Sequence, residues 1–202
     1  IISRKLDIEF YIRSRVDTLN EEIIGKLKEA GCKRIQLGVE SGSPRILKLM
    51  NKGIIIDQIK YTAGLVKKYN IPLYADFMLG YPTETKEEIE QSIRFAIDID
   101  PDYAQFGVTM LFPKTKIYEN ALKSGFLKED FWRKVTLHPD PDITYPIASE
   151  RYSKEELEKM QYKAHLRFYF RPAFLIKKLY KIKNLKELKR QAQAGLKLLL
   201  KG

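Results

Sequence analysis

Four short apolar runs, each followed by an amphipathic segment, constrain the fold of this chain more than any other feature. The runs begin near Asp7, Lys33, Ile71 and Tyr103, and the segments between them repeat apolar residues at helical spacing. Alternation of this kind with short connections requires parallel strands joined by right-handed crossovers. The sequence therefore predicts an α/β fold, a partial (β/α) barrel of about four strand–helix units, over residues 1–125.

Charge divides the chain into a neutral front and a basic back. Residues 1–150 carry 22 basic and 22 acidic side chains, whereas residues 151–202 carry 15 basic and 4 acidic ones, so the whole net charge of +11 lies in the last 52 residues. This asymmetry marks a compositional boundary near residue 151. We expect residues 126–150 to form an irregular, proline-rich connection and residues 151–202 to form a basic helical C-terminal extension.

Two capping patterns predict the helices of this extension. Ser153 with Glu156 begins one helix that should run to about Phe170, and Asn184 with Glu187 begins another, with Leu185, Leu188, Ala192 and Leu199 on one face. The lysines and arginines of residues 171–202 leave three roles open. They are a solvated helix face, a contact with RNA, or a contact with an anionic membrane surface.

A single cysteine bounds the chemistry of the chain. Cys32 has no partner for an internal disulfide, which fits a reducing compartment and predicts a cytoplasmic protein. No stretch approaches the length of apolar residues that a transmembrane helix needs. His138 and His165 lack metal-ligand spacing, and no serine–histidine–acid set or phosphate loop is present. The chain also opens on Ile1 in a strand-like segment, so we expect it to be part of a longer polypeptide.

Polar residues gather at the predicted carboxyl ends of the strands, where parallel sheets bind their ligands. Arg15 follows the first strand, Glu40 and Ser41 follow the second, and residues 80–84 follow the third. A structural role is the alternative for each of them. Glu40 and Ser41 can cap the helix that begins at Pro44.

The arginines of the first strand have a structural alternative of their own. Arg13 and Arg15 can pair with Asp76 or Glu40 inside the sheet. The other role open to these arginines is a contact with a bound ligand.

Five motifs together carry a resemblance to a known family. They are RVDTL (residues 15–19), GVESGS (38–43), NKG (51–53), FMLGYPTET (77–85) and FPKTKIY (112–118). In this order and at this spacing they resemble the C-terminal part of the barrel of the radical S-adenosylmethionine (SAM) superfamily, over about residues 7–125. Lys114 stands where the family usually has glycine. Residues 168–172, FYFRP, are similar to the cobalamin-binding branch of Fe–S oxidoreductases and methyltransferases.

The resemblance implies a [4Fe–4S] cluster that cleaves SAM to a 5′-deoxyadenosyl radical, with cobalamin as a further cofactor in that branch. It implies that Glu40 and Ser41 contact the methionyl or ribose groups of SAM and that Arg15 lies near a carboxylate. It also implies that Gly38, Gly80 and Pro82 let the backbone approach the cofactor. A carboxylate suits an ammonium group or a ribose diol because it accepts charge-assisted hydrogen bonds. No residue is assigned to the chemical step.

The chain departs from the family at the cluster. The family holds it with a CxxxCxxC loop, because three thiolates bind three of the irons, and this sequence has only Cys32. Either the cluster loop, and any cobalamin domain, belongs to a partner segment upstream of Ile1, or the chain is a degenerate relative. We expect the chain alone to be inactive. The alternative function is a non-enzymatic α/β module whose basic tail binds RNA or an anionic membrane.

Overall fold

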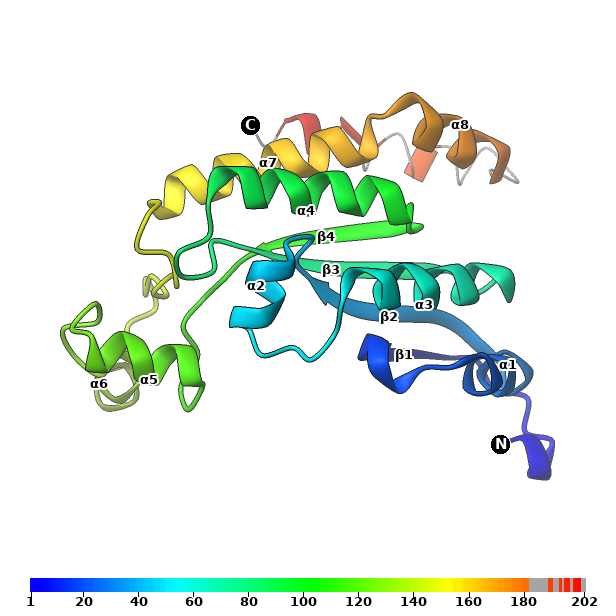
Figure 1. The fold of residues 1–202 in the computed structure, drawn as a ribbon, viewed down its shortest axis with the longest axis horizontal. Helices are drawn as coiled ribbons and strands as arrows, with labels where there is room; N and C mark the ends of the chain where they lie inside the picture. The colour runs from blue at the N-terminus through cyan, green and yellow to red at the C-terminus, as the bar shows by residue number, and fades with distance from the viewer. Residues whose placement is uncertain (182–188, 191–192, 194, 197, 201–202) are drawn as a thin grey trace.

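Four strands form one parallel sheet in the order β1–β2–β3–β4 (Figure 1). In this computed structural model they are β1 (Phe10–Ser14), β2 (Cys32–Glu40), β3 (Leu73–Leu79) and β4 (Tyr103–Val108). Every neighbouring pair is parallel, which confirms the predicted α/β fold with a partial barrel of four strand–helix units. The structure describes residues 1–181, 189–190, 193, 195–196 and 198–200, so the predicted cap at Asn184 and Glu187 lies outside the described residues.

Side-chain caps begin several of the helices. They are α1 (Glu21–Glu29), α2 (Pro44–Leu49), α3 (Ile56–Lys68), α4 (Lys86–Ile99), α5 (Lys116–Lys123), α6 (Phe131–Leu137), α7 (Lys154–Tyr169) and α8 (Pro172–Lys181), with 3-10 turns η1 (Ile2–Arg4) and η2 (Val16–Thr18). Asn20 and Ser43 each accept a backbone N–H of the first helical turn. Thr85 and Ser153 each form a complete capping box. These side chains satisfy amides that a helix start leaves without partners.

Side chains on the two faces of the sheet differ in polarity. The buried positions of β2 and β3 alternate along the strand and meet helices α1, α3 and α4 in one hydrophobic core (Figure 1). Leu37, Phe77 and Phe106 lie at the centre of this core and are fully buried. The alternate positions of all four strands point away from these helices and are largely polar. Parallel strands that are covered on both faces are usually apolar on both, so a polar face indicates a ligand-facing surface.

Helix α7 covers the outer edge of β4. The Tyr169 hydroxyl donates to the Ala104 carbonyl and accepts the Ala104 N–H, while Gln161 donates to the Phe106 carbonyl. The apolar side of α7 joins the sheet core, with Leu157 and Phe168 fully buried. Residues after the compositional boundary at 151 therefore complete both the core and an edge of the sheet.

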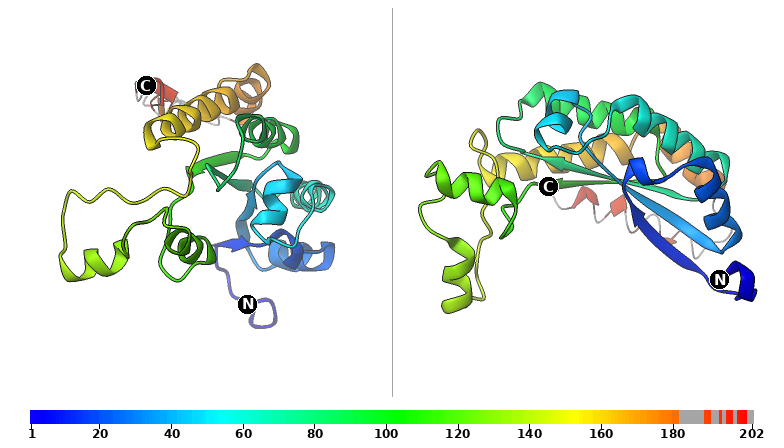
Figure 2. Two further views of the ribbon diagram at one scale, coloured as in Figure 1. Left: turned by 60° about the vertical axis from the view of Figure 1, so that its left-hand side comes forward. Right: turned by 60° about the horizontal axis from the view of Figure 1, so that its bottom comes forward.

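The segment between β4 and α7 forms a small lobe at the carboxyl end of the sheet. Figure 2 shows α5 and α6 standing apart from the other helices. A single bridge joins Met110 to Ile147, and the lobe has its own small core around Leu111 and Tyr118. Within the proline-rich residues 126–150, Asp130 caps helix α6, which the sequence analysis does not predict.

The first strand differs from the prediction. β1 covers only Phe10–Ser14 of the run that begins near Asp7, and Val16 lies buried in the 3-10 turn η2. Within the part of the chain that the structure describes, no helix has the length and apolarity needed to cross a bilayer.

Candidate functional site

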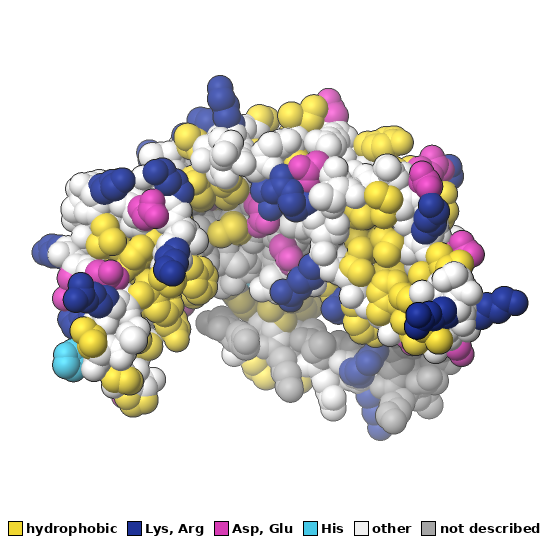
Figure 3. All heavy atoms as spheres, turned by 90° about the horizontal axis from the view of Figure 1, so that it is seen from below, with side chains coloured by type: hydrophobic (Ala, Val, Ile, Leu, Met, Phe, Trp, Pro, Cys, Tyr) yellow, Lys and Arg dark blue, Asp and Glu magenta, His cyan; other side chains and the backbone are white. Residues whose placement is uncertain are grey.

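The polar face of the sheet consists of rows of side chains that cross neighbouring strands. We define the polar face as Tyr11, Arg13, Arg34, Gln36, Gly38, Glu40, Tyr74, Asp76, Tyr103 and Gln105. The strand register places Tyr11 beside Arg34 and Tyr74 beside Tyr103 near the amino ends of the strands. Seen from below, acidic and basic side chains lie together near the hollow that separates the α5–α6 lobe from the rest of the molecule (Figure 3).

The row nearest the amino ends is aromatic and cationic. The Arg34 guanidinium lies 4.5 Å from the ring centre of Tyr11 and 4.6 Å from that of Tyr74. Tyr74 stacks on Tyr103 with ring centres 4.4 Å apart. Cation–π contacts and ring stacking therefore link the side chains of this row to one another across the four strands.

The next row is a hydrogen-bonded chain across three strands. Arg13 Nε donates to Gln36 Oε1 at 3.3 Å, and Gln36 Nε2 donates to the two carboxylate oxygens of Asp76 at 3.0 and 2.7 Å. Asp76 therefore pairs with Gln36 and not with an arginine. The predicted alternative, in which Arg13 or Arg15 pairs with Asp76 or Glu40, is wrong: Arg13 donates to the nearer amide, and Arg15 pairs with Asp17.

Three of the six predicted site residues converge on Lys52 at the carboxyl end of β2. Lys52 Nζ lies 2.7 Å from Glu40 Oε1, and both side chains are largely buried. Arg15 Nη2 donates to the Lys52 carbonyl at 2.6 Å. A Cβ on Gly38 would lie 2.5 Å from Glu40 Oε1 and 3.2 Å from Lys52 Nζ, so the glycine leaves the room that this pair occupies. The arrangement presents a carboxylate, an ammonium and a guanidinium within one small area.

The backbone at Glu40 is strained. Its φ is +69°, a left-handed conformation that a side chain with a Cβ rarely adopts, and the β2–β3 register shifts between Gly38 and Glu40. Such outliers persist only where the surrounding structure holds them, and they are frequent at binding sites. Here the ion pair with Lys52 helps to stabilise the left-handed conformation of Glu40.

Arg15 is held by a neighbouring acid. Its Nε and Nη2 donate to the two carboxylate oxygens of Asp17 at 2.9 and 2.7 Å. This hydrogen bonding raises the pKa of Arg15 and lowers the pKa of Asp17. Both groups stay charged at neutral pH and remain partly exposed, so Arg15 can also meet an anionic ligand group.

Ser41 does not join this group. Its side chain is fully buried, where its Oγ accepts the Ser43 N–H at 3.0 Å and lies 3.1 Å from Ser92 Oγ on α4. Ser92 Oγ also accepts the Gly42 N–H at 2.8 Å. The structure thus places Ser41 where it fastens the loop after β2 to α4.

Gly80 and Pro82 lie in the next turn, between β3 and α4. Gly80 has φ +78°, and a Cβ there would lie 2.4 Å from the Leu157 side chain of α7, so only glycine fits. Its N–H and that of Tyr81 both donate to Glu84 Oε2, at 2.6 and 3.2 Å. Burial raises the pKa of Glu84 to about 7. Pro82 is half-buried within this turn.

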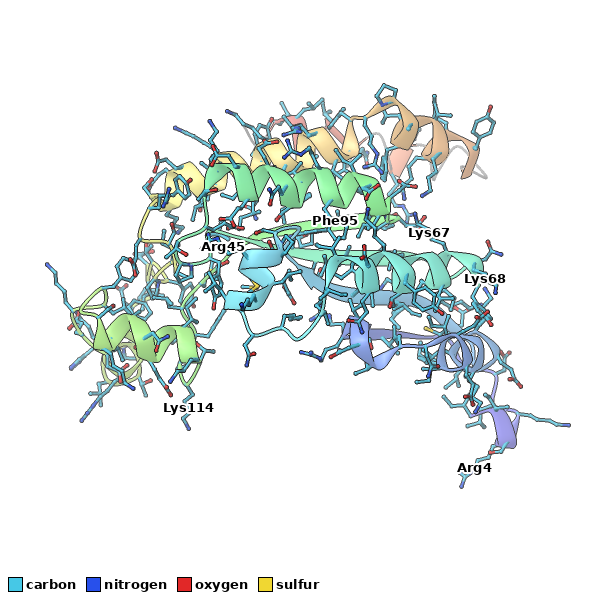
Figure 4. All side chains as sticks on the ribbon, viewed as in Figure 1. Arg4, Arg45, Lys67, Lys68, Phe95 and Lys114 are labelled. Atoms are coloured by element: carbon cyan, nitrogen blue, oxygen red, sulfur yellow. The ribbon has the colours of Figure 1, made fainter. Side chains whose placement is uncertain are left out.

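An ion pair between the exposed Arg45 and the buried Glu88 joins that turn to α2. Arg45 donates to both oxygens of Glu88, at 2.8 and 2.5 Å, and to the Thr83 carbonyl at 3.0 Å. The hydrogen bonds from Arg45 are the main reason that the pKa of Glu88 falls to about 2. Figure 4 shows Arg45 between α2 and the beginning of α4. The loops after β2 and β3 are thereby fixed relative to each other.

Residue patterns within the strands could have identified more of the site. Gln36, Asp76 and Gln105 occupy alternate polar positions in strands that otherwise read as apolar, a period-2 signal that marks one face. Lys52 gave no such signal, because it lies in a loop 12 residues beyond the carboxylate that it pairs with.

The residues present do not fit an iron–sulfur cluster. Cys32 is buried and its Sγ lies 3.3 Å from the Arg34 carbonyl. Across the described ranges, no three histidine, cysteine, aspartate or glutamate side chains are grouped to hold a metal. A cluster needs three thiolates, so this chain cannot supply its ligands by itself.

The polar groups do fit a zwitterionic ligand that carries a ribose. Glu40 and Asp76 can accept hydrogen bonds from an ammonium or a diol, and Arg15 can meet a carboxylate. Glu40 and Arg15 lie at the carboxyl ends of β2 and β1, where barrels and open α/β sheets bind their ligands, and Asp76 lies midway along β3. The fold is a partial (β/α) barrel, and its polar sheet face is the candidate ligand site.

Comparison with known proteins identifies the family. Residues 1–96 match the model of the Radical SAM superfamily. An uncharacterized methyltransferase of Pyrococcus horikoshii, PH0819, is 37% identical over 175 residues, which are 87% of this chain and 37% of that protein. This chain belongs to the radical SAM superfamily, as its motifs predict.

Solved structures share the fold at low identity. The alignment with the apo form of the cobalamin-dependent SAM radical enzyme OxsB covers 94% of this chain and 33% of the OxsB chain. Its TM-score is 0.57 and the sequence identity is 18%. The alignment with the radical SAM methyltransferase TsrM from Kitasatospora setae covers 62% of this chain and 25% of the TsrM chain. Its TM-score is 0.54 and the sequence identity is 21%. The chain therefore spans about a third of the length of the relatives that it matches.

Proposed function

We propose that this chain supplies part of the SAM- and substrate-binding wall of a cytoplasmic radical SAM methyltransferase or oxidoreductase. The observation that carries the proposal is the group formed by Arg15, Gly38, Glu40 and Lys52 at the carboxyl end of β2. The methyltransferase name of the 37%-identical relative supports this reaction class. When bound to the cluster, SAM supplies a 5′-deoxyadenosyl radical or a methyl group.

Each residue of the group has a distinct part in this proposal. Glu40 accepts hydrogen bonds from the ammonium or ribose of SAM, and Lys52 fixes the orientation of the carboxylate. Arg15 meets the methionyl carboxylate, while Gly38 leaves space beside the strand. Ser41 acts indirectly, because its buried hydroxyl holds the loop that carries Glu40.

A second part of the proposal concerns the cluster. We propose that cysteines of another segment of the polypeptide hold the [4Fe–4S] cluster, and that this segment pairs with the free edge of β1. Among the described residues β1 pairs only with β2, whereas α7 covers the edge of β4. Cobalamin would bind outside this chain as well. The support is the sequence likeness of residues 168–172 and the fold shared with OxsB and TsrM.

The variant Glu40→Gln tests the SAM wall. It keeps the shape of the side chain but removes its charge, so the affinity for SAM should fall about tenfold, the usual worth of one charge-assisted hydrogen bond. Isothermal calorimetry with SAM measures the change. The matched control is Glu9→Gln. Glu9 also pairs with a lysine, but it is exposed and lies outside the group around Glu40. Equal affinities of Glu40→Gln and the unsubstituted chain would contradict the proposal.

Anaerobic reconstitution tests where the cluster is held. Incubation of residues 1–202 with iron and sulfide should give no stable [4Fe–4S] absorbance, because one thiolate cannot hold the cluster. Cys32→Ala is the control and should behave identically. A stable cluster that disappears in Cys32→Ala would show that this chain holds it.

A further inference from the structure

Helix α8 turns apolar side chains outward and lysines inward, the reverse of an ordinary surface helix. Its outward side chains are large and apolar: Leu175 is 43% exposed, Ile176 54%, Leu179 61% and Tyr180 88%. Its inward side consists of Phe174, which is buried, and of two half-buried lysines. A water-exposed helix normally turns its lysines outward and its leucines inward.

The contacts of the inward side explain this orientation. Lys177 Nζ lies 2.8 Å from the Asp100 carboxylate, and Arg171 pairs with the same group. Lys178 Nζ lies 3.9 Å from the ring centre of Tyr103. Phe174 packs on Phe168 with ring centres 5.4 Å apart. Ion pairs and aromatic contacts thus hold α8 so that its leucines and isoleucine face out.

The charge of the sequence segment that contains α8 favours one kind of partner. Residues 171–202 carry ten basic side chains and one acidic one, Glu187, a net charge of +9. Lys189, beyond α8, is exposed. The interface of an anionic lipid bilayer accepts apolar side chains and also attracts a positively charged segment. The ten described residues of α8 are long enough to lie in the interface of a bilayer.

We propose that α8 docks this protein on anionic membrane surfaces, with Leu175, Ile176, Leu179 and Tyr180 inserted at the boundary between headgroups and acyl chains. This inference goes beyond the proposed function and does not depend on it. RNA is the less favoured partner, because the two described lysines of α8 face the sheet and its outward residues cannot pair with phosphates.

Vesicle flotation tests the proposal with the full 202-residue chain. The probes are vesicles of phosphatidylcholine alone and vesicles with 30% phosphatidylglycerol added. We expect the chain to partition at least about tenfold more strongly to the anionic vesicles, and this preference to fall as salt is raised. The double variant Ile176→Glu/Leu179→Glu should lower that binding by about tenfold or more, because it places two carboxylates in the apolar interface. Both substitutions lie on the exposed side, so the variant keeps its fold, which circular dichroism checks.

The matched control is the double variant Ile55→Glu/Tyr61→Glu. Both residues are more than 60% exposed and lie at or beside α3, and the control should bind vesicles as the unsubstituted chain does. Three results would overturn the proposal. They are an absence of vesicle binding, an equal loss in both double variants, and a concentration-dependent dimer that Ile176→Glu/Leu179→Glu abolishes. Tight, salt-sensitive binding of a uridine homopolymer without vesicle binding would assign the surface to RNA instead.

Discussion

At the scale of single residues, Glu84 is a buried carboxyl group whose ionisation affects the fold. It is buried, and its Oε2 accepts two backbone N–H groups of the turn after β3, while its Oε1 has no hydrogen-bond partner among the described residues. Burial disfavours the charged form and raises its pKa to about 7. The turn that carries Gly80 therefore has a carboxyl group that titrates near neutrality.

The sign of the resulting pH dependence follows from linkage. The folded state keeps a proton on Glu84 up to about pH 7, whereas the unfolded chain releases it near its ordinary pKa of 4.5. The contribution of Glu84 to stability is therefore fully present below pH 4.5 and is lost as the pH rises through 7. At one pKa unit per 1.4 kcal/mol, the loss amounts to roughly 3 kcal/mol at most.

The variant Glu84→Gln isolates this effect. Glutamine keeps an oxygen that accepts the two N–H groups and never ionises, so its stability relative to the unsubstituted chain should rise between pH 5 and pH 8 by up to about 3 kcal/mol. Urea unfolding at both pH values measures the difference. Glu87→Gln, a fully exposed neighbour, should leave the pH dependence unchanged. Parallel stability curves for Glu84→Gln and the unsubstituted chain would show that Glu84 is ionised throughout.

At the scale of elements, features that depend on residues close together in the sequence could be predicted. Contacts between residues far apart in the sequence could not. Ser153 and Glu156 form the predicted capping box, and Thr85 and Glu88 form a second one of the same sequence pattern, because every partner lies within one helical turn. Helix α6 was not predicted, since three prolines follow it closely and its cap, Asp130, accepts a hydrogen bond from Tyr118 of α5.

The candidate site shows the same division. Glu40 could be singled out because its strand and its glycines are adjacent in sequence. Its partner Lys52 and the buried position of Ser41 depend on how the loop after β2 folds against α2 and α4. Arg45 was missed for this reason too, because its carboxylate partner lies 43 residues further along the chain.

At the scale of the whole molecule, the compositional boundary and the hydrophobic core divide the chain differently. The net charge is confined to residues 151–202, yet α7 lies within these residues and buries Leu157, Ala164 and Phe168 in the core of the sheet. Its side chains also form hydrogen bonds with backbone N–H and C=O groups of β4. We therefore expect the folding unit to extend through α7, and the function of the basic segment to begin after it.

Two truncations test this expectation. Residues 1–150 lose α7, and burial of a leucine or phenylalanine contributes about 1.5–3 kcal/mol each, against a typical total of 5–15 kcal/mol for a domain. The unpaired β4 backbone adds a further cost. Residues 1–150 should therefore show no cooperative unfolding in urea, as followed by circular dichroism. Residues 1–171 keep α7 and should unfold cooperatively, with stability lowered by about 2 kcal/mol because Phe174 is no longer buried. Cooperative unfolding of residues 1–150 at the midpoint of the full chain would place the boundary of the folding unit at residue 150.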